Sequence, residues 1–339
     1  MYHCAMKQAI LLLLILATST SYSQDFSQET LSEVVSDSIS GLEGPIDFQK
    51  RKRIFWATGI GGYSAMATGL YFAWYNQFDQ EAFHTFDDWN EWRNVDKAGH
   101  VYSAYFQAQL INDAALWAGY SEEKALVISS LASLWGQLNI EIMDGFSSEW
   151  GFSAGDVAGN LLGTGLFYAQ QKIWKEQRIK VKMSFWPVSY PVQTLDSESG
   201  LAQSSLQGRS EELYGTGLER FLKDYNGQTI WLSANPSMFF PDTKLPKWLS
   251  VAVGYSAHNL FGGFENSWEL DDERFVLDQD LFPRSSQFIL ALDYDLRKVK
   301  HSTAFGTALF KLLDIFKFPA PAVSYDTARG WQLHFLYLN

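Results

Sequence analysis

The chain has 339 residues, and its 38 acidic side chains outnumber its 26 basic ones, which gives a formal net charge of −12. Proteins that bind nucleic acids need basic patches that displace counterions from phosphates, so this charge excludes a general nucleic-acid role. The aromatic fraction of 16%, with 13 Trp, is high, and Trp and Tyr are enriched in proteins that lie at membrane interfaces.

The first residues predict a secretory signal peptide over residues 1–23. Lys7 precedes an uninterrupted apolar run, Ala9–Ala17, and small residues up to Ser23 follow as a cleavage pattern. An uncleaved anchor is the alternative interpretation. The only cysteine, Cys4, lies ahead of the run. The mature chain is therefore expected to lack disulfides, cysteine nucleophiles, cysteine metal ligands and a lipid-modified cysteine.

A polar lead-in over residues 24–53 is followed by a segment, Ile54–Tyr75, that contains no charge. This segment is long enough to cross a bilayer core of about 30 Å. A transmembrane helix and a central, fully buried helix of a soluble bundle are the two interpretations. Four basic residues, Lys50–Arg53, directly precede this segment. After export they would lie on the outer side of the inner membrane, whereas basic residues that flank a membrane span usually lie on the cytoplasmic side. An outer-membrane association removes this conflict.

Three further helices are predicted: one over Ala98–Ala118, one that starts at Ser121 and runs to Met143, and one that starts at Ser153. The last contains glycines that permit close approach to a neighbouring helix, namely Gly155, Gly159, Gly163 and Gly165. Short connections between helices of this length predict a four-helix bundle over residues 54–175, whose apolar segments also fit a membrane.

Polar side chains within these apolar helices come in pairs that are three or four residues apart and therefore share a helix face. The pairs are Asp96 with His100, Glu141 with Asp144, and Asp156 with Asn160, and Lys97 follows the first Asp. Ionisable groups on an apolar face cost free energy unless they meet partners. We therefore expect these seven residues, called the polar cluster below, to converge.

Three kinds of site fit the polar cluster. In an enzyme, a carboxylate would orient His100 for acid–base work, and Glu141 and Asp144 would share a raised pKa, which makes these three residues the catalytic candidates. A metal site is the second alternative, with the ion and any other cofactor left open. The third is a hydrogen-bonded network that fixes the register of the helices.

The second half of the chain predicts a small sheet. Residues 176–217 combine a strand candidate with a polar linker, and residues 218–339 form an α+β region. Large apolar residues alternate with small or acidic ones in the best strand candidates, Leu249–Ala257 and Phe288–Leu296. Weaker strand candidates and one helix complete the region: Val181–Tyr190, Thr229–Asn235, Trp331–Leu338, and the helix Thr303–Lys317.

The number of strands decides how this region is interpreted. A single-chain membrane barrel needs about eight strands, and only four or five candidates are present. The fold class is therefore mainly α with an α+β C-terminal region, in which an antiparallel sheet follows the bundle. The large apolar face of the sheet is expected to pack on the helices, with lipid or a partner protein as the alternative contact.

Three motifs carry a resemblance to known families: Asp96-Lys97-x-x-His100, Glu141-x-x-Asp144-Gly145, and Ser153-x-x-Asp156-x-x-x-Asn160-x-x-Gly163. In this order they resemble the YfiM-type family of envelope lipoproteins, a domain of unknown function, in its long Bacteroidetes-like form. Segments 222–229 and 318–322 extend the resemblance over most of the mature chain. More distantly, the motifs are similar to the helical VanZ-like family, which is linked with glycopeptide resistance.

The resemblance implies a helical fold and an envelope location but no established reaction. Together with the residues, it predicts an exported, membrane-associated protein in the outer membrane or at a periplasm-facing membrane surface. Its expected role is lipid-binding or structural, with membrane lipid or envelope components as partners and no indicated oligomeric state. The alternative is an acid–base or metal-assisted hydrolase or transferase that acts on a lipid-linked envelope precursor.

Overall fold

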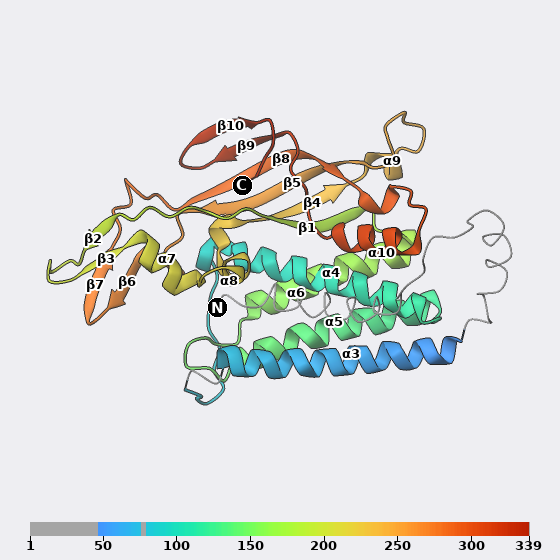
Figure 1. The fold of residues 1–339 in the computed structure, drawn as a ribbon, viewed down its shortest axis with the longest axis horizontal. Helices are drawn as coiled ribbons and strands as arrows, with labels where there is room; N and C mark the ends of the chain where they lie inside the picture. The colour runs from blue at the N-terminus through green and yellow to red at the C-terminus, as the bar shows by residue number, and fades with distance from the viewer. Residues whose placement is uncertain (1–46, 76–78, 339) are drawn as a thin grey trace, which may run out of the picture.

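The computed structural model describes residues 47–75 and 79–338. The predicted signal peptide and residues 24–46 of the polar lead-in lie outside the described residues, and the rest of the lead-in belongs to the start of a helix. The helices form one layer and a curved antiparallel sheet forms the other, with α4 between the sheet and the remaining long helices (Figure 1). The expected order, helices first and an antiparallel sheet after them, is confirmed.

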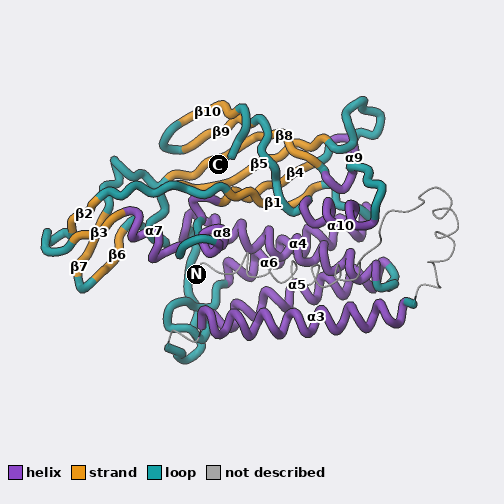
Figure 2. Tube along the Cα trace, viewed as in Figure 1, coloured by secondary structure: helices purple, strands orange, loops and turns teal. Residues whose placement is uncertain are grey.

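Four long helices make up the first layer (Figure 2). They are α3 (Phe48–Leu70), α4 (Val95–Trp117), α5 (Glu122–Asp144) and α6 (Ala154–Trp174). Local capping sets two of the starts, because the hydroxyl of Ser121 accepts a hydrogen bond from the Lys124 N–H and that of Ser153 accepts one from the Asp156 N–H. Both starts lie where the sequence predicts them.

The contact between α4 and α6 is close because glycines of α6 face α4. A Cβ on Gly163 would lie 2.2 Å from the Val101 carbonyl oxygen, and one on Gly159 would lie 3.0 Å from the Lys97 carbonyl oxygen. Only hydrogen fits at these positions, so the two backbones meet directly. Gly165 differs, since no neighbouring atom lies within 4 Å of the place where its Cβ would be.

The uncharged segment Ile54–Tyr75 forms the exposed part of helix α3 and then a short π-helical turn, Tyr71–Tyr75, in which Tyr75 is buried. No residue of α3 whose side chain is described is buried, and Ile60 is 61% exposed. The expectation of a central, fully buried helix is therefore wrong, because α5 and α6 already cover α4 and leave α3 at the edge of the bundle. Among the described helices, α5 alone is long and apolar enough to cross a membrane by length and composition.

The second layer is a six-stranded antiparallel sheet with the strand order β1-β4-β5-β8-β9-β10. Its strands are β1 (Ile179–Phe185), β4 (Gln228–Ala234), β5 (Leu249–His258), β8 (Ser285–Tyr294), β9 (Ala322–Asp326) and β10 (Gly330–His334). Two ribbons stand apart from it, β2 (Thr194–Asp196) with β3 (Gln203–Ser205), and β6 (Ser267–Leu270) with β7 (Glu273–Val276).

The shorter helices are α7 (Leu206–Tyr214), α8 (Leu218–Lys223), α9 (Pro236–Phe239) and α10 (Ala304–Leu313). Four of the expected strands are found as β1, β4, β5 and β8, the last expected segment contains β10, and the expected helix is α10. Strand β9, which pairs with both β8 and β10, was not predicted. Its five residues are too short for a clear alternation to stand out from the Pro-flanked sequence around it.

The burial of the two sheet faces is largely the reverse of the expected one. Asp293 is fully buried, whereas Phe288 and Leu290 are each 54% exposed. The small and polar residues face inward because lysines of β1 neutralise the acids there, with Lys182 Nζ at 3.0 Å from Asp293 Oδ2. The ring of Tyr337, from the end of the chain, packs on Trp231 and covers part of the same face.

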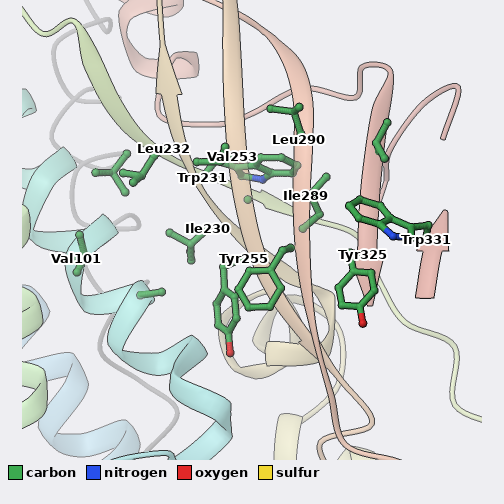
Figure 3. A pocket seen from close by; sticks show the side chains of 15 residues that line it. Val101, Ile230, Trp231, Leu232, Val253, Tyr255, Ile289, Leu290, Tyr325 and Trp331 are labelled. Atoms are coloured by element: carbon green, nitrogen blue, oxygen red, sulfur yellow. The ribbon is translucent and has the colours of Figure 1, made fainter. Parts of the chain in front are cut away.

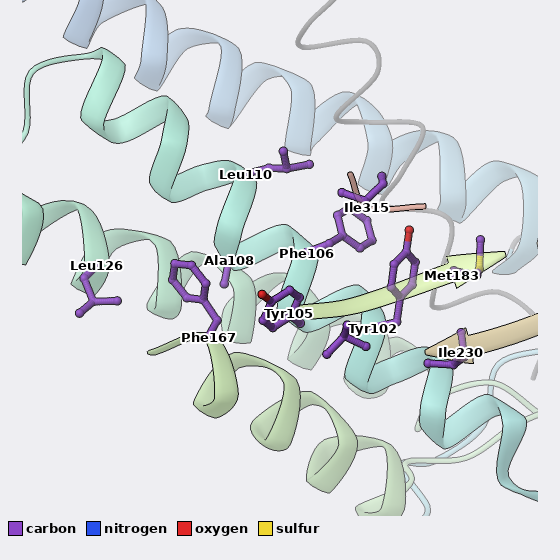
Figure 4. Packing of buried hydrophobic residues seen from close by; sticks show 11 residues of the cluster. Tyr102, Tyr105, Phe106, Ala108, Leu110, Leu126, Phe167, Met183, Ile230 and Ile315 are labelled. Carbon is purple, nitrogen blue, oxygen red and sulfur yellow. The ribbon is translucent and has the colours of Figure 1, made fainter. Parts of the chain in front are cut away.

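Helices cover the large apolar face of the sheet only at the β1 and β4 end. There Tyr102 and Phe106 of α4 and Phe167 of α6 pack in one core cluster with Met183 of β1 and Ile230 of β4 (Figure 4). Toward β8, β9 and β10 the same face is open. It forms one wall of an apolar groove of about 710 Å³ whose other wall includes Ala98 and Val101 of α4 (Figure 3).

Candidate functional site

The residues of the polar cluster meet where the first turns of α4 and α6 lie beside the last turns of α5. His100 is central, and its side chain is 2% exposed. Asp96, Glu141, Asp156 and Asn160 are also almost completely buried, with exposed fractions of 1% to 3%. The structure thus brings together side chains that are up to about sixty positions apart in the sequence, and it encloses them rather than placing them in an open cleft.

The imidazole of His100 faces oxygen atoms on both sides. Its Nδ1 lies 3.1 Å from Asn160 Oδ1 and 3.6 Å from Glu141 Oε1. Its Nε2 lies 3.5 Å from Asp156 Oδ1 and 3.9 Å from Asp96 Oδ1. Only the contact with Asn160 is short enough for a hydrogen bond, so Asn160 sets the orientation of the ring.

Lys97 is the positive charge of the cluster and lies between three carboxylates. Its Nζ is 2.5 Å from Asp88 Oδ2, 2.8 Å from Asp156 Oδ1 and 3.4 Å from Asp96 Oδ2. The acidic neighbours raise the pKa of Lys97 above its usual range against the opposing effect of burial. Lys97 therefore stays charged and ties the start of α4 to the start of α6.

The buried acids of the cluster differ in the direction of their pKa shift: the pKa is raised for Glu141 and Asp156 and lowered for Asp96. Burial, together with the nearby charges of Asp144 and Asp96, raises the pKa of Glu141 well above its usual range. Burial and neighbouring carboxylates do the same to the pKa of Asp156. Burial also disfavours ionisation of Asp96, yet the charge of Lys97 and the hydrogen bond from the Tyr225 hydroxyl oppose this effect, and the pKa of Asp96 is lowered.

Glu141 and Asp144 are on one face of α5, as their spacing predicts, but their surroundings differ. Glu141 is 1% exposed, whereas Asp144 is partly exposed and accepts a hydrogen bond of 2.6 Å from the hydroxyl of Tyr75. Asp144 therefore lies at the edge of the cluster. The roles of His100, Glu141 and Asp144 in catalysis stay a prediction.

Three residues that the sequence analysis did not include in the cluster take part in it. Asp88 pairs with Lys97 and accepts a 2.7 Å hydrogen bond from the Ser153 hydroxyl. The hydroxyl of Tyr225, which lies next to β4, donates to Asp96 Oδ1. Tyr75 holds Asp144. Asp88 lies in an irregular Trp-rich loop and Tyr225 is 129 positions from Asp96, so helical spacing does not indicate either of them.

Comparison with known proteins gives one match. Residues 85–172 are similar to a family described as predicted periplasmic lipoprotein (DUF2279). None of the curated proteins compared with the chain matches it, and none of the solved structures does. The matched region begins before α4, ends within α6 and contains the whole polar cluster, whereas the expected resemblance extends to the sheet.

The match supports the expectation of an exported, envelope-associated protein. The family that it resembles is one of lipoproteins without an assigned activity. The chain departs from a lipoprotein pattern in one respect, because Cys4 is its only cysteine and lies ahead of the apolar run.

Proposed function

We propose that this protein is a non-enzymatic component of the cell envelope that binds membrane lipid through α3, on the periplasmic side of an envelope membrane. One observation carries the proposal. From Ile54 to its end α3 has no charged residue, and none of its described side chains is buried in the protein. An apolar surface of this length is unfavourable in water and favourable against lipid.

The start of α3 has the chemistry of a membrane interface. Four basic residues, Lys50–Arg53, precede the apolar part of the helix, and each such charge near an anionic lipid surface contributes about 1 kcal/mol. Beside them, Trp56 Nε1 donates a 2.8 Å hydrogen bond to the Tyr120 hydroxyl. Trp and Tyr favour the headgroup level because their rings are apolar and their polar atoms bind water.

The apolar surface continues beyond α3. Leu131 and Trp135 on α5 are 62% and 60% exposed, and Leu162 on α6 is 67% exposed. The groove between α4 and the sheet adds a further apolar surface. Exposed apolar patches of this extent mark contacts with lipid or with other proteins, and the basic and aromatic residues at the start of α3 favour lipid.

The buried polar cluster supports a positioning role rather than a reaction. Its members other than Asp144 are buried, and its central residue, His100, is 2% exposed. A hydrolase or transferase that acts on a lipid-linked precursor would need access to His100 and Glu141. That alternative stays a prediction, with His100, Glu141 and Asp144 as its candidates.

Vesicle flotation tests the proposal. The purified full chain should float with vesicles that contain anionic phosphatidylglycerol and should float less with vesicles of neutral phosphatidylcholine. The substitution Ile60→Glu places a charge on the exposed apolar part of α3 and should reduce the floated fraction severalfold. Far-UV circular dichroism checks that the variant is folded.

Leu201→Glu is the matched control, because Leu201 is an exposed leucine (83%) in the turn between β2 and β3. This variant should float as the wild type does. Equal flotation of the wild type, Ile60→Glu and Leu201→Glu would exclude α3 as the lipid contact, and absence of flotation in the wild type would exclude lipid binding itself.

A further inference from the structure

The hydrogen bond to Asn160 defines the tautomer of His100. Asn160 Oδ1 lies 3.1 Å from His100 Nδ1 and can only accept, so Nδ1 carries the proton. A neutral imidazole has one proton, which leaves a lone pair on Nε2.

The lone pair on Nε2 points toward carboxyl oxygen atoms. Asp156 Oδ1 is 3.5 Å away and Asp96 Oδ1 is 3.9 Å away, and neither distance is that of a good hydrogen bond. All three residues are 2% exposed. A lone pair that faces two carboxyl oxygens in a buried site is repelled unless a proton or a metal ion lies between them.

The site also holds more carboxyl groups than cationic side chains. Four carboxyl groups, those of Asp88, Asp96, Glu141 and Asp156, surround His100 and the single ammonium of Lys97. Lys97 Nζ contacts Asp88 Oδ2 and Asp156 Oδ1, whereas Glu141 Oε1 is buried and has no hydrogen-bond partner among the described residues. A bound divalent cation would stabilise the charged form of these carboxyl groups.

The spacing of the three donor atoms fits such an ion. Asp96, His100 and Asp156 each offer one atom, and these atoms all lie within 4.8 Å of one another. Ligand atoms at 2.0–2.2 Å from Zn²⁺ in a tetrahedral site are roughly 3.3–3.5 Å apart. The distances of 3.5 Å and 3.9 Å from His100 Nε2 therefore need only small side-chain shifts.

We propose that His100 Nε2, Asp96 and Asp156 bind a divalent transition-metal ion, with Zn²⁺ as the first candidate. One imidazole and two carboxylates suit Zn²⁺ or Mn²⁺ better than Ca²⁺, which prefers a shell of oxygen atoms only. Asn160 then acts as the partner of the second ring nitrogen, which commonly orients a metal-bound histidine. The ion joins α4 to α6 and is independent of lipid binding by α3.

The test uses the purified full chain, treated with a chelator and then dialysed against Zn²⁺ or Mn²⁺. Elemental analysis should find about one ion per chain, and the loaded protein should unfold at a higher temperature than the chelator-treated protein. X-ray absorption of the Zn²⁺-loaded wild type should show one imidazole, oxygen ligands and no sulfur. This spectrum needs no variant, so it stays decisive if a variant fails to fold.

His100→Gln and Asp156→Asn should each weaken binding at least about tenfold. His258→Gln is the matched control, because His258 is also largely buried and its Nε2 donates a hydrogen bond of 3.3 Å to Gln287 Oε1. This variant should bind as the wild type does. Absence of stoichiometric binding by the wild type, a spectrum without imidazole, or unchanged binding by both folded cluster variants would overturn the proposal.

Discussion

Lys97 is expected to contribute more to stability than its neighbours, because its ammonium group is the positive charge next to three buried carboxylates. Asp88, Asp96 and Asp156 all lie within 3.4 Å of its Nζ. Removal of one partner from a buried ion pair leaves uncompensated charge in a low-dielectric interior. Removal of one partner from an exposed ion pair has a small effect on stability, because water solvates the charge that remains.

Lys97→Met should therefore lower the free energy of unfolding by about 3–5 kcal/mol. Lys172→Met is the matched control: Lys172 pairs with Glu123 at 3.6 Å, and the two side chains are 52% and 79% exposed. The control should change the free energy of unfolding by less than about 1 kcal/mol. Urea denaturation of both variants measures the difference, and similar effects in the two would contradict the assignment of a buried charge centre.

Glu91, beside the cluster, has a folded-state pKa that lies within the physiological range. Burial, with added repulsion from Asp96 and Asp88, raises the pKa of Glu91 to about 7. The folded protein then holds this proton more tightly than the unfolded chain does. Stability from this group is present below the unfolded pKa near 4.5 and is lost as the pH rises to about 7.

Glu91→Gln should remove this pH dependence, because glutamine does not ionise. We expect the free energy of unfolding of the wild type to fall by about 1–3 kcal/mol more than that of the variant between pH 5 and pH 8. Urea denaturation at both pH values gives the comparison. Parallel pH profiles for the two proteins would show that Glu91 is ionised in both states at pH 5.

At the scale of elements, the contact between α4 and α6 determines whether the polar cluster can form. The glycines of α6 let Lys97 and His100 of α4 approach Asp156 and Asn160 directly. The same helix also contains Gly165, which has open space where a Cβ would lie. Substitutions at Gly163 and Gly165 therefore distinguish the effect of close helix packing on stability from the effect of helix propensity.

Gly163→Ala should lower the free energy of unfolding by about 1–3 kcal/mol, because its Cβ would meet backbone atoms of α4 and push the helices apart. Gly165→Ala should be neutral or raise it by up to about 1 kcal/mol, since alanine favours a helix interior over glycine. Thermal and urea unfolding of the pair measure both effects. Equal destabilisation by both substitutions would show that α6 packs on α4 through a different face.

At the scale of the whole molecule, the helical layer and the sheet share one core. The cluster around Tyr102 and Phe106 includes residues from α4, α5, α6, β1 and β4, together with Ile315. The predicted regions 54–175 and 218–339 are therefore in contact along the length of α4. Tyr225 adds a polar link, because its hydroxyl donates to Asp96 from the sheet side.

Phe106→Ala should consequently destabilise both layers, by about 3–5 kcal/mol. Hydrogen exchange should show loss of protection in α6 and in β5 together. Phe288→Ala is the control, because Phe288 lies on the open apolar face and is 54% exposed, and it should have a much smaller effect. Loss of protection confined to the helices would mean that the two layers unfold independently.

The sequence by itself determined the long helices, the main strands and the pairing of polar residues within each helix. Helical periodicity and capping are local, so Ser121, Ser153 and the spacing of Asp156 and Asn160 indicated starts and faces without knowledge of the fold. The positions of β5 and β8 followed for the same reason, because side chains alternate at every second residue of a strand.

Tertiary structure alone decided which elements cover one another. It placed α3 outside the bundle, buried the acidic face of the sheet against Lys180 and Lys182, and brought Asp88 and Tyr225 to the polar cluster. These outcomes depend on contacts between segments that are far apart in the chain. The local periodicity of the sequence indicates which side chains lie on the same face of an element. Which other element packs on that face depends on the free energy of packing between segments that are distant in the chain.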